Sequence, residues 1–141
     1  MLYPKIMGLD VGEKRIGIAL SDPLRITAQG LESYQVRGEE ADIAYLKALC
    51  EQHGVQQIVC GFPKNMNGSI GPQAEKISAF ADKLREATGR ELILEDERLT
   101  TVLAQRTLIE ADVSRAKRRK VVDKLAAVAI LQGYLDRTKN Y

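Results

Sequence analysis

The chain has 141 residues, with 21 Lys and Arg against 19 Asp and Glu, so its formal net charge is only +2. We expect one domain over residues 1–141, and the 45% apolar content argues against disorder. The sequence has no run of about 18 apolar residues and no signal-peptide core, which predicts a cytoplasmic protein without a membrane span.

The hydrophobic pattern predicts an α/β fold. Strands are expected over residues 5–10, 15–21, 27–36, 57–62 and 91–94, and helices over 39–53, 73–88, about 100–111 and about 121–135. A turn at 11–14, a polar loop at 63–71 and a basic loop before the last helix connect them. This order predicts an antiparallel three-strand meander followed by βαβα, forming a mixed five-stranded sheet flanked by helices.

Three acidic positions contrast with their apolar surroundings. Asp10 ends the first strand, Asp96 and Glu97 follow the fifth, and Asp123 lies in the apolar last helix. Each position also has a structural interpretation. Asp10 can begin a turn, Asp96 can cap a helix, and Asp123 can pair with Lys120 or Lys124.

Acids of this kind are suited to divalent metal chemistry. Hard cations such as Mg²⁺ take oxygen ligands, and two such ions can drive phosphodiester hydrolysis. This chemistry needs no histidine, and the chain has only His53. Together with Cys50 and Cys60 it offers too few nitrogen and sulfur ligands for a structural zinc site, and we expect both thiols to be reduced core residues.

The positive charge is concentrated near the C-terminal end of the sequence. Residues 115–139 contain eight basic and two acidic side chains, a balance of +6, whereas the remaining 13 basic and 17 acidic residues give −4. A charge run of this kind can be a solvated loop. Because the cluster 115–120 directly precedes the expected helix that carries Asp123, it also favours contact with a polyanionic backbone.

Four segments resemble the bacterial YqgF/RuvX family: MGLDVGEKRIGIALSD (7–22), GFPKNMNGSIGPQA (61–74), EDERLTT (95–101) and KVVDKLAAVAILQGYLD (120–136). The resemblance covers nearly the whole chain, and Phe62 and Ile18 stand where Leu and Val are more usual in the family. It implies an RNase H-like fold related to RuvC-type resolvases, and a metal-dependent nuclease.

The resemblance also implies the site residues. The family's acids fall on Asp10, Glu97 and Asp123, with Asp96 as a neighbouring candidate, and these residues would bind Mg²⁺ or Mn²⁺, with two ions expected. A further set of residues would hold the nucleic acid backbone: Lys14, Arg15, Lys64, Asn65, Arg98, Arg115, Arg118, Arg119 and Lys120.

The expected substrate is a structured RNA, the precursor of 16S rRNA processed at its 5′ end. A Holliday junction, a branched DNA, is the alternative, and a monomer or a weak homodimer is expected. A nucleic-acid-binding or transcription-associated module with a vestigial acidic site is the non-enzymatic alternative. A sugar-kinase-like phosphotransferase would share Asp10-Val11-Gly12 but needs two lobes around ATP, which this length does not supply.

Overall fold

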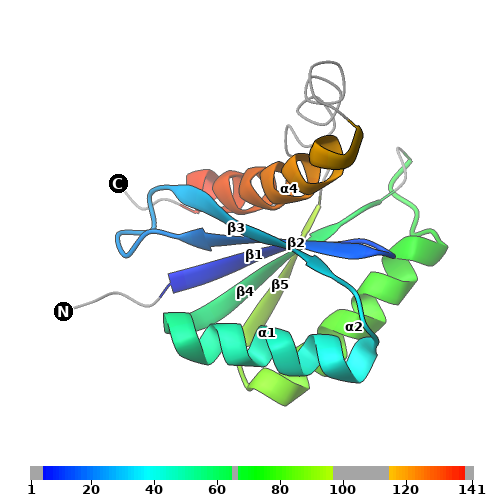
Figure 1. The fold of residues 1–141 in the computed structure, drawn as a ribbon, viewed down its shortest axis with the longest axis horizontal. Helices are drawn as coiled ribbons and strands as arrows, with labels where there is room; N and C mark the ends of the chain where they lie inside the picture. Colours follow the sequence, from blue (N-terminus) through cyan, green and yellow to red (C-terminus); the bar gives the residue numbers. More distant parts are fainter. Residues whose placement is uncertain (1–4, 65–66, 97–114, 139–141) are drawn as a thin grey trace.

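A computed structural model describes residues 5–64, 67–96 and 115–138 of the chain. Two helices lie on one face of a sheet and one long helix crosses the other face (Figure 1). The described elements are β1 (Lys5–Val11), β2 (Arg15–Ser21), β3 (Ala28–Gln35), α1 (Glu39–His53), β4 (Val55–Phe62), α2 (Pro72–Thr88), β5 (Glu91–Asp96) and α4 (Arg115–Arg137).

The five strands form one mixed sheet in the order β3-β2-β1-β4-β5. β1, β2 and β3 pair antiparallel, which confirms the predicted meander. β4 pairs parallel with β1, and β5 pairs parallel with β4, because α1 and α2 supply the crossovers that parallel strands require. The carboxyl ends of β1, β4 and β5 therefore meet at one edge of the sheet, as expected from the sequence.

Strand alternation divides the sheet into two differently packed faces. Met7 and Leu9 of β1 belong to the larger core, which also includes residues of α1 and α2. Ile6 belongs to a second core beneath α4, and the alternation places Gly8 and Asp10 on that same face. Asp10 therefore lies on the α4 side of the sheet.

The edge strand β3 is tied to α1 through two tyrosines. The Tyr34 hydroxyl donates to Asp42 over 2.8 Å, and Tyr45 donates to Glu32. The two rings stack with their centroids 4.3 Å apart. The hydrogen bond to the Glu32 carboxylate, together with burial, raises the pKa of Tyr45 to about 12. These contacts fix β3 from the face opposite α4.

α4 begins earlier than the sequence predicts. It starts at Arg115, so the cluster 115–120, expected to be a loop, lies in the first turns of this helix. Lys and Arg are good helix formers, and the apolar part of the helix anchors the turns that precede it. The helix predicted at about 100–111 lies outside the described residues. None of the described helices has the length and apolar content needed to cross a membrane.

Candidate active site

Asp10 and Asp123 are brought to the same part of the sheet by a close backbone approach. Asp10 pairs across the strands with Gly17 of β2, so both lie on the α4 face. α4 passes directly over Gly17: a Cβ placed there would lie 2.0 Å from the carbonyl oxygen of Asp123. Only a residue without a side chain permits this approach. The close approach places Asp123 over Gly17, the cross-strand neighbour of Asp10.

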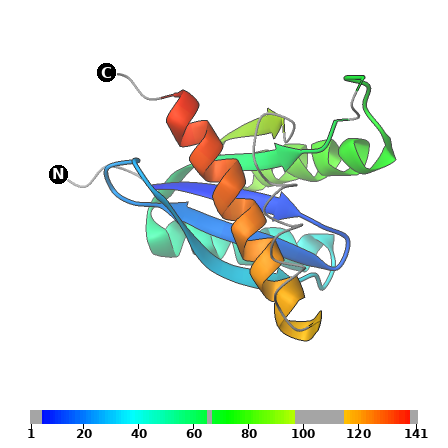
Figure 2. The same cartoon turned by 90° about the horizontal axis from the view of Figure 1, so that it is seen from above.

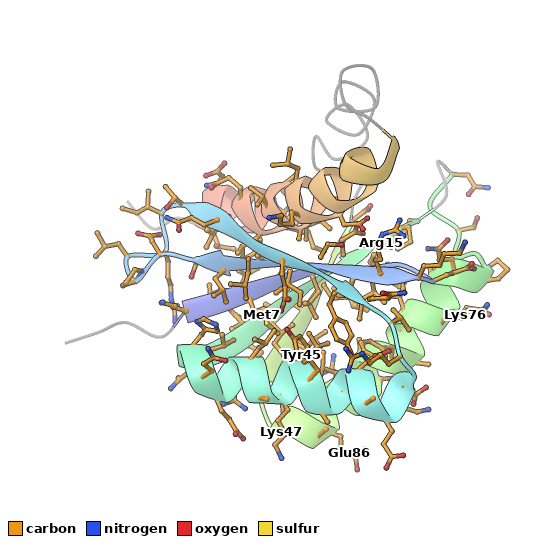
Figure 3. The ribbon with its side chains drawn as sticks, in the orientation of Figure 1. Met7, Arg15, Tyr45, Lys47, Lys76 and Glu86 are labelled. Atoms are coloured by element: carbon orange, nitrogen blue, oxygen red, sulfur yellow. The ribbon has the colours of Figure 1, made fainter. Side chains whose placement is uncertain are left out.

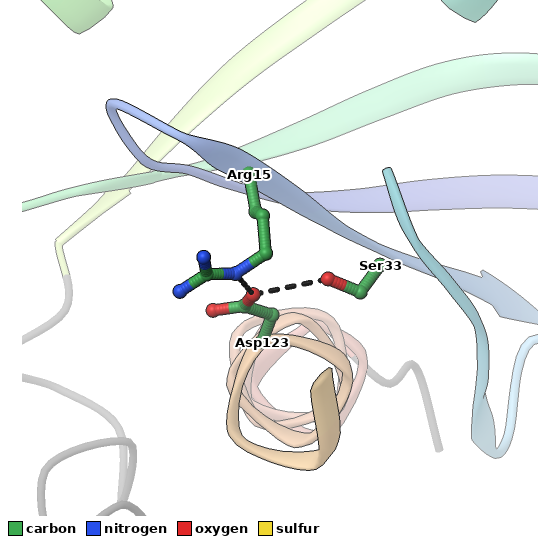
Figure 4. A network of polar contacts seen from close by, with 3 residues as sticks. All are labelled: Arg15, Ser33 and Asp123. Carbon is green, nitrogen blue, oxygen red and sulfur yellow. Dashed lines mark hydrogen bonds and ion pairs between the residues drawn. The ribbon is translucent and has the colours of Figure 1, made fainter. Parts of the chain in front are cut away.

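The Asp123 carboxylate is held by two residues of the meander (Figure 4). Arg15 Nε donates to Asp123 Oδ2 over 2.6 Å, and Ser33 Oγ donates to the same oxygen over 3.0 Å. The side chains of Arg15 and Asp123 are 28% and 17% exposed, so the pair is partly shielded from water. Figure 3 shows Arg15 on the α4 side of the sheet, with Tyr45 on the other side.

The ion-pair partner of Asp123 in the structure differs from those suggested by the sequence. The sequence suggested Lys120 or Lys124 as the partner. The side chain of Lys120 lies outside the described part of the chain, and the partner that the structure describes is Arg15, 108 residues away. Neighbours on the same helix were the nearest cations in sequence. Because α4 packs on β2, a cation of the sheet reaches Asp123.

The third expected acid, Glu97, and its neighbour Arg98 lie outside the described residues. β5, which precedes them, ends at Asp96 at the same sheet edge as Asp10. The register pairs Asp96 with Phe62, a residue of the α1–α2 core. Alternation therefore puts Asp96 on the opposite face from Asp10, which disfavours Asp96 as its partner in a metal site.

Glu95, in contrast, lies on the α4 face and was not singled out from the sequence. It pairs with Gly61 across β4 and β5 and is only 3% exposed. Arg137 of α4 forms an ion pair with its Oε1, while no described residue is a hydrogen-bond partner for the buried Oε2. This ion pair ties the end of α4 to β5.

The expected backbone-binding residues are only partly described. Lys14 is exposed in the turn between β1 and β2, and Lys64 is the second residue after β4. Asn65 lies outside the described residues, and only the helical backbone is described for Arg115, Arg118, Arg119 and Lys120. Among these expected residues, Arg15 has a described contact with a predicted acid, Asp123.

The donor set near Asp10 and Asp123 is chemically suited to a hard divalent cation. The available ligand atoms are carboxylate oxygens, which Mg²⁺ and Mn²⁺ prefer. Within residues 5–64, 67–96 and 115–138, no three His, Cys, Asp or Glu side chains are grouped closely enough to hold one ion. Two carboxylates on one face of the sheet, with a third expected at position 97, fit such an ion.

Comparison with known proteins gives consistent matches along the chain. The sequence profile of RuvX, described as a Holliday junction resolvase, matches residues 4–137. A Clostridium kluyveri protein is 56% identical over 133 residues, 94% of this chain and 97% of its own length. A Moorella thermoacetica protein is 58% identical over 133 residues, 94% of this chain and 95% of its own. Both carry the name of a candidate pre-16S rRNA nuclease.

Solved structures share the fold at low sequence identity. Thermus thermophilus RuvC in complex with a Holliday junction superposes with a TM-score of 0.60 at 11% identity, covering 96% of both chains. The fowlpox virus Holliday junction resolvase gives 0.56 at 15% identity, covering 96% of this chain and 99% of its own. The RNase H-like fold expected from the sequence is thereby confirmed.

Proposed function

Because the chain is a nuclease of the RuvX family, we propose that it cleaves precursor 16S rRNA with Mg²⁺ or Mn²⁺ held by Asp10, Glu97 and Asp123. The observation that carries the proposal is that Asp10 and Asp123 are both neighbours of Gly17: Asp10 pairs with it across the strands, and the backbone of Asp123 lies over it. Asp123 is held by Arg15 and Ser33, and α4 and β1 bring it and Asp10 to the same face of the sheet although they are far apart in the chain. Two carboxylates on one partly exposed face are the oxygen ligands that a shared divalent cation would use.

The bound cation, or a pair of cations, would activate the attacking water and stabilise the leaving oxygen. The residues of the chain hold and orient the reactants. Asp10 and Asp123 supply ligand oxygens from a strand and a helix, and rigid elements of this kind set ligand positions closely. Lys14, Lys64 and the basic first turns of α4 supply positive charge for the phosphate backbone.

The names of the close relatives favour RNA as the substrate. A precursor rRNA substrate would place the protein in the cytoplasm. The second candidate is cleavage of a Holliday junction, which is favoured by the description of the matching family profile. Rates on the two substrates, measured side by side with the same preparation, separate these candidates. Faster cleavage of the precursor rRNA at its 5′ side is the expected result.

The nuclease proposal is tested with Asp10→Asn, which keeps the size of the side chain and removes its charge. We expect cleavage to fall by a factor of about 10³ or more, because a neutral amide is a poor ligand for a hard cation. Glu13→Gln is the matched control, since Glu13 is an exposed acid in the adjoining turn. It should leave cleavage unchanged, and thermal unfolding should confirm that both variants fold.

Metal-dependent cleavage by Asp10→Asn at the wild-type rate would contradict the assignment of this site. Salt-sensitive nucleic acid binding by the wild-type protein without turnover, and without stabilisation by Mg²⁺ or Mn²⁺, would instead support a binding module with a vestigial acidic site.

A further inference from the structure

Three residues form a row across the meander beneath the first part of α4. Ser33 of β3 pairs with Gly17 of β2, and Gly17 pairs with Asp10 of β1. Paired residues on neighbouring strands lie on the same face, so all three face α4. Because Asp123 lies over Gly17, it has Ser33 on one side and Asp10 on the other.

The hydrogen bonds of Asp123 are unequally divided between its two oxygens. Arg15 Nε and Ser33 Oγ both donate to Oδ2. Neither these residues nor any other described residue donates to Oδ1. In Figure 4, the second carboxylate oxygen points away from Ser33. The strand order puts Asp10 on that side of Gly17.

We propose that Ser33 is a positioning residue that, with Arg15, holds Oδ2 of Asp123 and commits Oδ1 to the divalent cation. This inference rests on the proposed function, since it takes Asp123 to be a metal ligand. A carboxylate can bind a cation with one oxygen or with both, and it can rotate about its χ2 angle. Two donors fixed on one oxygen remove this freedom and leave a single ligand atom on the Asp10 side.

Ser33 and Arg15 contribute differently to this orientation. Arg15 carries a positive charge, so it holds Asp123 but also competes with a metal ion for the carboxylate. Ser33 is neutral, so its hydroxyl orients the carboxylate without electrostatic repulsion of a cation. Hydrogen bonds to metal-ligating side chains typically change metal affinity by 10-fold to 100-fold. Substitution of Ser33 therefore measures the effect of carboxylate orientation on metal affinity without also changing the charge near the metal.

The test is the affinity of the full chain for Mn²⁺ alone, measured by titration calorimetry or by the electron spin resonance of free Mn²⁺. Ser33→Ala should weaken binding about tenfold, whereas Ser33→Thr, which keeps the hydroxyl, should bind as the wild type does. Gln35→Ala is the control, because Gln35 lies two residues along β3 on the same face and does not bond to Asp123. It should leave Mn²⁺ affinity unchanged.

Cleavage assays add a second readout. The rate of Ser33→Ala should fall more at low Mn²⁺ than at saturating Mn²⁺, because the defect lies in holding the ion. Wild-type Mn²⁺ affinity in Ser33→Ala would overturn the inference. An equal loss in Ser33→Ala and Ser33→Thr would also overturn it, because the hydroxyl would then not be the group that acts.

Asp123→Asn separates this inference from the proposed function. If Asp123→Asn abolishes Mn²⁺ binding while Ser33→Ala does not weaken it, the positioning role fails and the metal site stands. If Asp123→Asn binds Mn²⁺ as the wild type does, the assignment of Asp123 as a ligand fails, and the positioning role fails with it.

Discussion

Substitution of Gly17 by alanine tests the contact on which the site depends. The new Cβ would lie 2.0 Å from the carbonyl oxygen of Asp123 and 2.6 Å from its carbonyl carbon. Ordinary contact begins at 3.4 Å, so the two backbones must separate by about 1.4 Å. The obstacle is main chain of a 23-residue helix, which cannot turn aside as a side chain would.

Such a separation should lower both stability and activity. Overpacking of this kind costs about 1–3 kcal/mol, which for a domain of this size corresponds to a fall in Tm of roughly 3–10 °C. The same movement carries Asp123 away from Asp10. A misplacement of about 1 Å in an active site can reduce the rate about 100-fold. The cleavage rate at saturating Mn²⁺ should therefore fall by a larger factor than the fraction of folded protein does.

Two other glycines beneath α4 provide graded controls. A Cβ at Gly30 would meet the Lys124 Cβ at 3.5 Å, which is ordinary contact, so Gly30→Ala should be neutral or stabilising by up to about 1 kcal/mol. A Cβ at Gly8 would lie 2.7 Å from the Leu131 Cβ. Gly8→Ala should therefore destabilise the fold with a smaller effect on cleavage. Wild-type stability and cleavage in Gly17→Ala would refute the reasoning.

Three further predictions concern ionisable groups outside the proposed metal ligands. Arg137→Ala leaves the buried carboxylate of Glu95 without its ion-pair partner and should cost about 1–3 kcal/mol by urea unfolding, less than for a fully buried pair because Arg137 is 41% exposed. Hydrogen bonds from backbone N–H groups, chiefly that of Thr27, lower the pKa of Asp22 below its ordinary value of 3.8. The ionised Asp22 therefore stabilises the fold above pH 3.8, and this stabilisation should be lost as the pH falls below that value. Burial raises the pKa of the Cys50 thiol from 9.0 to about 11, so the stability that it contributes below pH 9 should be lost as the pH rises from 9 to 11. Native Cys50 should also react with Ellman's reagent at pH 9 at least about tenfold more slowly than in the unfolded chain.

Each of these has its own control. In a Glu95→Gln background the loss from Arg137→Ala should shrink, because no buried charge is left unpaired, and an undiminished loss would contradict the ion-pair explanation. Asp22→Asn should flatten the acid limb of the stability profile, and an unchanged limb would count against Asp22 as its source. Cys60→Ala leaves Cys50 as the single thiol for labelling, and equal rates before and after unfolding would contradict its burial.

Much of the fold was predictable because local patterns and tertiary structure agree. Alternation over residues 15–21 predicts a strand with one buried face, and the observed β2 has these bounds. The helical spacing over residues 39–53, followed by Gly54, predicts α1, whose end is the left-handed conformation of that glycine. Asp10 could be identified as a candidate because it is a charged residue in an apolar strand, and this contrast can be read from the sequence alone.

The partners of the acids could not be predicted in the same way. Arg15 reaches Asp123 only because α4 lies on β2, and Ser33 reaches it only because the β2–β3 register sets Ser33 opposite Gly17. Both facts depend on how distant segments pack. A serine in a polar edge strand carries no signal of its own. The helical conformation of residues 115–120 could not be predicted either, because this charged segment lacks the apolar periodicity that indicates a helix.

The long separation of Asp10 and Asp123 has a consequence for a chain that is still being synthesised. The strands that carry Asp10, Arg15 and Ser33 emerge first, and α4 follows every other described element in chain order. A nascent chain can therefore complete the sheet edge while it still lacks the helix that closes the site. A chain whose synthesis has not reached α4 lacks Asp123, one of the proposed ligands, so we expect it to be unable to cut RNA even without any inhibitor.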